Sequence, residues 1–130
     1  MIVDSIITCF KNYFRISGRA RRSEYWCFTI LLLIINILSL FFYTSYKARG
    51  GSIDLFICCV FGLLTLVCLI PWITVSCRRF HDIGKSASWM FFILVPVIGV
   101  IFYIVWMCTP ATELENQYGH IYEKHVKRLY

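Results

Sequence analysis

Five charged or titratable residues interrupt an otherwise very apolar chain. They stand close together and are Arg78, Arg79, His81, Asp82 and Lys85. Guanidinium groups bind carboxylates and phosphate oxygens with paired hydrogen bonds, whereas a histidine beside a carboxylate can serve as a general base. The stretch therefore admits three interpretations: a site for a lipid phosphate, the polar end of a membrane helix, or an active site.

A second charged stretch comes earlier in the chain. Its charged members are Arg19, Arg21, Arg22 and Glu24. An unpaired charge at the edge of a membrane is costly, so the two stretches are expected to pair if they share a membrane face. Glu24 is then expected beside Arg78 or Arg79, and an ion pair between Glu24 and Arg79 is the specific prediction.

Catalysis is the least favoured of the three interpretations. No nucleophile stands out near His81 beyond scattered serines. Adjacent side chains of a helix point about 100° apart, so Asp82 is poorly placed to orient His81. Cys77 and His81 stand four residues apart, but one cysteine and one histidine make a weak metal pattern. We therefore expect no enzyme, no metal and no cofactor, and a lipid-modifying enzyme that uses His81 is the weakest alternative.

The elements that must position these stretches are apolar enough to enter a membrane. Hydrophobic residues make up 59% of the 130 residues, and the mean hydropathy is +0.71, which is high for a water-soluble domain. Three windows contain no charged residue, and each is long enough to cross a hydrocarbon core of about 30 Å as a helix. We predict an all-α integral membrane protein with three transmembrane spans at about 25–46, 55–77 and 89–108.

Prolines mark two points where the predicted spans are expected to bend. Pro71 lies inside the second span, and Pro96 with Gly99 lies inside the third. A proline removes one backbone N–H from a helix and disturbs the turn before it. A re-entrant loop around "ILVPVIGVIF" is the alternative to a third crossing.

The remaining segments complete a single membrane domain over residues 1–130. Residues 1–24 form a basic arm, and within it residues 1–17 are predicted as an amphipathic helix in the membrane interface. The apolar face of that helix consists of Ile2, Ile6, Phe10 and Tyr13. Residues 109–130 are a polar tail.

Basic residues predict the orientation of the spans. Cytosolic segments next to a span are enriched in lysine and arginine. The arm and the second loop carry Lys11, Arg15, Arg19, Arg21, Arg22, Arg78, Arg79 and Lys85, whereas the first loop carries only Lys47 and Arg49. The N-terminus and the second loop are therefore expected in the cytosol, and three crossings would put the C-terminus in the periplasm.

One polar residue, Asn36, lies in the middle of the first span. It is predicted to bond another helix across an interface, so a homo-oligomer or a membrane protein partner is expected. An oligomeric transport or pore-forming subunit is the alternative function. The net charge of +6 lies next to apolar windows, so membrane lipids with anionic headgroups, and not nucleic acid, are the expected partners.

Three motifs in order carry a resemblance to a known family. They are "GRARRSEYW" at 18–26, "RRFHDIGKSASW" at 78–89 and, after a "VPVIG" segment, "ENQYG" at 115–119. The chain resembles a family of small bacterial inner-membrane proteins of unknown function, the domain of unknown function 805 family. Ala87 and Ser88 stand where that family tends to have glycine and tryptophan. The resemblance implies a multi-pass protein of the bacterial inner (cytoplasmic) membrane and supplies no reaction or substrate.

The favoured function follows from the charged stretches and the resemblance together. We expect a non-enzymatic inner-membrane protein whose cytosolic-face cluster of arginine, glutamate, histidine and aspartate binds anionic lipid headgroups or a partner protein. The cluster consists of Arg19, Arg21, Arg22, Glu24, Arg78, Arg79, His81, Asp82 and Lys85.

Overall fold

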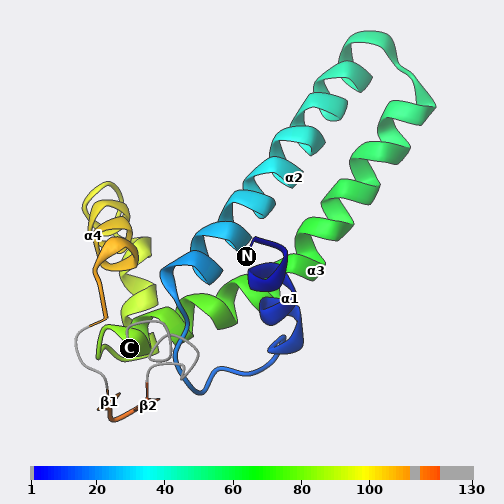
Figure 1. Cartoon of the computed structure of the whole chain (residues 1–130). Coiled ribbons are helices and arrows are strands. Elements are labelled where there is room, and N and C mark those ends of the chain that lie inside the picture. Colours follow the sequence, from blue (N-terminus) through cyan, green and yellow to red (C-terminus); the bar gives the residue numbers. More distant parts are fainter. Residues whose placement is uncertain (1, 112–114, 121–130) are drawn as a thin grey trace.

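The computed structural model describes residues 2–111 and 115–120. These residues form helices almost throughout, with one very short antiparallel strand pair near the C-terminal end (Figure 1). In chain order the elements are α1 (Ile2–Lys11), α2 (Arg22–Arg49), α3 (Ser52–Asp82), the 3-10 helix η1 (Ala87–Leu94), α4 (Ile98–Cys108), β1 (Glu115–Asn116) and β2 (Gly119–His120). The helical fold class agrees with the prediction.

α2 and α3 form a long hairpin and contain the first two predicted spans (Figure 1). Gly50 ends α2 in the left-handed conformation, with φ of 69°, and its N–H donates to the Tyr46 carbonyl at 2.7 Å. The most apolar windows of the two helices have mean hydropathies of 2.3 and 2.7, yet only 11% and 6% of those windows is buried. Because so much apolar surface is exposed, lipid and not water is the solvent that suits this hairpin.

Pro71 divides α3 into a long apolar part and a shorter part that turns beneath α2 toward α4 (Figure 1). A proline has no N–H, so the Val67 carbonyl one turn earlier loses its usual helical donor. The Tyr13 hydroxyl takes that role and donates to the Val67 carbonyl at 2.5 Å. Every residue from Thr74 to Asp82 is buried, so the bend carries the charged stretch into the base of the molecule.

α1 packs against α2 and α3 at the level of this bend (Figure 1). Ser5 and Cys9 face the protein, while Ile2, Val3 and Ile7 are exposed. Burial raises the pKa of the Cys9 thiol to about 11, so this thiol is an inert packing group. A helix thus forms in the predicted arm, over a shorter range, and its place in the membrane interface stays a prediction.

The third predicted span, 89–108, is not one helix in the structure. η1 and α4 are separated by Val95, Pro96 and Val97, and they pack against each other as a short hairpin. Val97 has a φ of 63°, and a Cβ added to Gly99 would lie 2.0 Å from the Phe92 carbonyl oxygen. Pro96 therefore starts the break, and Gly99 permits the close return of the chain.

Each limb of the short hairpin is about half as long as a membrane is thick. The eight residues of η1 rise about 2.0 Å each and the eleven of α4 about 1.5 Å each, which gives roughly 16 Å per limb. A hydrocarbon core is about 30 Å thick. Among the residues that the structure describes, two helices are therefore long enough to cross a membrane, and a third apolar segment is folded back.

An aromatic core joins the two hairpins at the base. Tyr25 of α2 lies 6.5 Å from Tyr103 of α4, and Tyr103 lies 5.6 Å from Phe80 of α3, measured between ring centroids. Phe28 and Met107 are fully buried beside them. This core fixes α4 next to the end of α3, where the charged residues gather.

Candidate functional site

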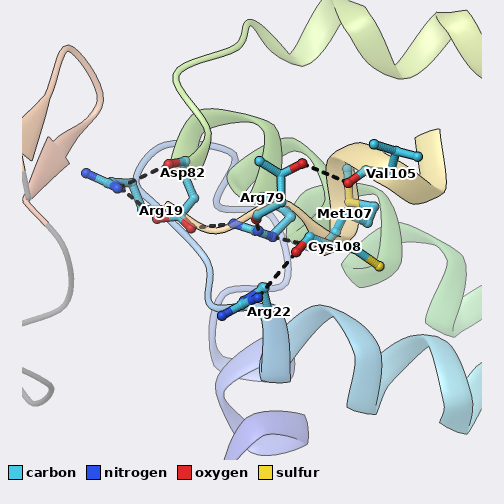
Figure 2. A network of polar contacts seen from close by, with 8 residues as sticks. Arg19, Arg22, Arg79, Asp82, Val105, Met107 and Cys108 are labelled. Carbon is cyan, nitrogen blue, oxygen red and sulfur yellow. Dashed lines mark hydrogen bonds and ion pairs between the residues drawn. The ribbon is translucent and has the colours of Figure 1, made fainter. Parts of the chain in front are cut away.

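The polar cluster lies where the end of α3 meets the arm before α2 and the end of α4 (Figure 2). Arg78 and Arg79 are 4% and 0% exposed, and His81 and Asp82 are 8% exposed. Such burial is unusual for arginine and aspartate unless they are paired. The structure thus brings together the two charged stretches that the sequence predicted to meet.

Asp82 ties the arm to α3. Its Oδ1 accepts from Arg19 Nε at 2.8 Å, and its Oδ2 accepts from Arg79 Nη1 (Figure 2). Arg19 Nη2 also donates to the Asp82 backbone carbonyl at 3.1 Å. Beside this pair, the Ala20 N–H donates to the Arg78 carbonyl at 3.1 Å. One carboxylate therefore pairs with two guanidinium groups from different parts of the chain, and one of their two positive charges stays unbalanced.

Two arginines satisfy the carbonyls at the end of α4. Arg79 donates from Nε to the Met107 carbonyl at 3.4 Å and from Nη2 to the Thr109 carbonyl. Arg22 Nη1 donates to the Cys108 carbonyl at 3.3 Å (Figure 2). The last carbonyls of a helix lack internal donors and carry partial negative charge, which cations stabilise. Arg22 and Arg79 thus hold the short hairpin to the base.

Glu24 pairs with Arg78, with Nη1 3.6 Å from Oε2. The predicted pair between Glu24 and Arg79 is therefore wrong, although Arg78 was the other expected position. Successive helical residues point about 100° apart, so Arg78 faces α2 while Arg79 faces the end of α4. Arg78 Nε and Nη2 are buried, and neither has a hydrogen-bond partner in the described part of the chain.

His81 is buried in a packing role. Its Nδ1 lies 3.3 Å from the Gly18 carbonyl oxygen, and its ring stacks on Tyr118 at 4.0 Å between centroids. Both oxygens of Asp82 are engaged by Arg19 and Arg79, so Asp82 does not orient the imidazole. Tyr118 was absent from the predicted site. Its only signal in the sequence was its place in the third motif.

Lys85 lies against aromatic rings instead of joining the ion pairs. Its Nζ is 4.8 Å from the Trp89 ring centroid and 5.0 Å from that of Trp106, which are cation–π distances. An open apolar pocket of about 370 Å³ begins beside Trp89 and is also lined by Ser88, Phe91, Phe92 and Val95. Lys85 is therefore the member of the polar cluster that lies beside the apolar pocket.

Two predicted site residues lie differently from the rest. Arg21 is half-buried at the start of α2. Asn36 is exposed, and its Nδ2 donates to the Leu32 carbonyl of its own helix at 2.8 Å. Among the described residues, its side chain makes no hydrogen bond to another helix. Other side chains bond across α2 and α3: Trp72 Nε1 donates to Thr29 Oγ1 at 3.2 Å, and Ser45 Oγ donates to Asp54 Oδ2 at 3.2 Å.

The fold and the cluster define a class: small helical membrane proteins in which paired charges close one end of an apolar hairpin. The chain belongs to the family described as a protein of unknown function (DUF805), which it matches over residues 13–120. This confirms the resemblance that the three motifs predicted.

Two relatives from Escherichia coli strain K12 are similar over nearly their whole length. Inner membrane protein YhaH is 35% identical over 118 residues, which cover 90% of this chain and 94% of the relative. Inner membrane protein YhaI is 33% identical over 118 residues, which cover 88% of this chain and 91% of the relative. No solved structure matches the chain significantly. These relatives are inner-membrane proteins, and the apolar helices of this chain fit insertion into such a membrane.

Proposed function

We propose that the chain is a non-enzymatic multi-pass protein of the inner membrane whose polar cluster binds the phosphate of an anionic lipid headgroup on the cytosolic side. The observation that carries the proposal concerns Arg78, whose Nε and Nη2 are buried without a hydrogen-bond partner among the described residues. Both nitrogens lie on one edge of the guanidinium plane. Such an edge suits two oxygens of a single phosphate group.

The charge balance of the cluster supports this proposal. Its cations are Arg19, Arg21, Arg22, Arg78, Arg79 and Lys85, and its anions are Glu24 and Asp82. Six positive charges against two negative charges leave an excess of four. Arg22 is exposed, but removing the buried charges from water is costly unless opposite charges accompany them, so the positive excess favours a bound anion. Near a membrane the most abundant anions are lipid headgroups.

The surroundings of Lys85 favour a lipid over a free anion. Lys85 stands beside Trp89, and Trp89 also lines the open apolar pocket. A lysine at the membrane interface attracts phosphate, and an apolar hollow next to it suits part of an acyl chain. A phospholipid carries both groups in one molecule.

We also propose that the third apolar segment is re-entrant, so that the C-terminal tail lies on the same side as the arm. Support comes from the limbs of roughly 16 Å, and from Arg22 and Arg79, which bind the carbonyls at the end of α4. Charged arginines at that point agree with the headgroup level and not with the opposite leaflet. Under this proposal the C-terminus is cytosolic, whereas three crossings would place it in the periplasm.

Arg78→Lys is the variant that tests headgroup binding. A lysine keeps the charge opposite Glu24 but lacks the two-nitrogen edge. Arg49→Lys is the matched control, because Arg49 is exposed at the other end of α2. Native mass spectrometry would measure retention of phosphatidylglycerol, phosphatidylcholine and inorganic phosphate by each purified protein.

The parent and Arg49→Lys proteins are expected to retain phosphatidylglycerol in preference to the other two probes. Arg78→Lys is expected to retain roughly tenfold less, because a bidentate contact becomes a single one. Equal retention by all three folded proteins would contradict the proposal. A parent protein that prefers inorganic phosphate would also overturn it, since the site would then be specific for a free anion.

A further inference from the structure

One face of α2 repeats at the spacing of a helix–helix seam. Leu33, Asn36, Leu40 and Tyr43 are separated by three, four and three residues, so they form a single stripe along the helix. Leu33, Leu40 and Tyr43 are 59%, 62% and 43% exposed, and Asn36 is exposed as well. The stripe therefore lies outside the contact between α2 and α3.

Asn36 is the feature that makes this stripe more than a lipid-facing surface. Apolar residues alone give no reason for helices to associate, because lipid tails are as apolar as leucine. Asn36 lies halfway along the 28 residues of α2, and its one hydrogen bond among the described residues goes to Leu32 of its own helix. The amide oxygen and the second N–H are left toward the hydrocarbon, where unsatisfied polar groups cost free energy.

A second copy of the chain supplies an Asn36 amide at the same depth in the membrane. Two identical chains insert in the same orientation, so a two-fold axis along the membrane normal brings Asn36 of one copy to Asn36 of the other. Each amide can then donate to the oxygen of its partner. Leu33, Leu40 and Tyr43 are self-complementary in the same arrangement, because each meets its own counterpart along the seam.

We propose that two copies of this chain associate in the membrane through the α2 stripe of Leu33, Asn36, Leu40 and Tyr43, with the paired Asn36 amides at its centre. The stripe contains no residue of the polar cluster at the base. The dimer is therefore independent of headgroup binding, and either property can fail without the other.

Photo-crosslinking of the full chain in native membranes tests the surface directly. A benzoylphenylalanine at Leu40 places the reactive group on the stripe, whereas one at Ile34 places it about 160° around the helix from Asn36. Ile34 is a matched control, since it is 50% exposed and equally apolar. A dimer is expected from the Leu40 position and not from the Ile34 position. Equal yields at both positions, or crosslinks to other proteins alone, would overturn the proposal.

Asn36 itself is tested by energy transfer between labelled chains that are diluted in liposomes. Asn36→Leu is expected to weaken self-association roughly tenfold, because it removes the hydrogen bonds between the helices. Asn36→Gln keeps the amide and is expected to restore most of the association. A monomeric parent protein, or an Asn36→Leu variant that associates as tightly as the parent, contradicts the proposal.

Discussion

The two apolar hairpins of this chain differ in length because their turns lie at different distances along the chain from the polar cluster. The hairpin of α2 and α3 turns at Gly50 and Gly51, after an uncharged window long enough to cross the membrane. The hairpin of η1 and α4 turns at Pro96, in the middle of such a window. The length of an uncharged window is therefore not enough to count crossings, because a turn inside it halves the length of each helix.

The ends of the two hairpins are also held differently. At the far end of α3, Asp54 Oδ2 accepts one hydrogen bond from Ser45 Oγ at 3.2 Å. At the near end, Asp82 binds Arg19 and Arg79, and Arg79 in turn binds the carbonyls that end α4. The short hairpin thus depends on charges, whereas the long hairpin depends on packing between α2 and α3.

Of the substitutions proposed as tests, Asp82→Asn is expected to lower the free energy of unfolding most, because Asp82 holds the charged base of the short hairpin. Loss of the carboxylate leaves two buried guanidinium groups without their counter-charge, which costs about 3–5 kcal/mol of unfolding free energy. Asp54→Asn, on the same helix, should cost about 1 kcal/mol or less, because it alters one polar contact. Denaturation followed by circular dichroism in detergent measures both. Equal losses would show that Asp82 is no more important than Asp54.

Gly99→Ala should break the short hairpin alone. An added Cβ would lie 2.0 Å from the Phe92 carbonyl oxygen, so the two limbs must separate, at a cost of about 2 kcal/mol. Gly62→Ala in α3 is the control, since a Cβ there meets nothing within 4 Å. Thermal melting of the two purified variants makes the comparison. A Gly99→Ala protein as stable as Gly62→Ala would mean that the segment is straight.

Tyr13→Phe tests the bend of α3, and its expected loss of unfolding free energy is smaller than that of Gly99→Ala. The variant leaves the Val67 carbonyl without its donor and should cost about 1 kcal/mol. In a Pro71→Ala background the helix regains the N–H that serves this carbonyl, so the same change should cost less. A double-mutant cycle on unfolding free energies measures the coupling. Purely additive losses would argue against the role assigned to Tyr13.

Much of this architecture could be predicted from the sequence. The uncharged windows indicated α2 and α3, and Pro71 indicated the bend. The two charged stretches were expected to meet, and they do. The predicted partner of Glu24, Arg79, was wrong, and Arg78 takes that place. The directions of Arg78 and Arg79 depend on the helical phase after the bend, which the sequence does not specify.

Other features left little trace in the residue types. Pro96 and Gly99 predicted a bend, but the full return of the chain depends on the φ of Val97 and on the fit of Gly99 against Phe92. The acceptors for Arg22 and Arg79 at the end of α4 are backbone carbonyls, which every sequence contains. Sequence patterns therefore predict which side chains gather more readily than which backbone groups they bind.

The side of the membrane on which residue 130 lies decides whether the hairpin of η1 and α4 is re-entrant. Green fluorescent protein and alkaline phosphatase, fused in turn after residue 130, report cytosolic and periplasmic locations respectively, and fusions after Gly50 serve as the opposite-side control. A re-entrant hairpin predicts a fluorescent fusion without phosphatase activity at residue 130, and the reverse result after Gly50. Phosphatase activity at residue 130 would contradict the re-entrant hairpin, because η1 and α4 would then form a third crossing.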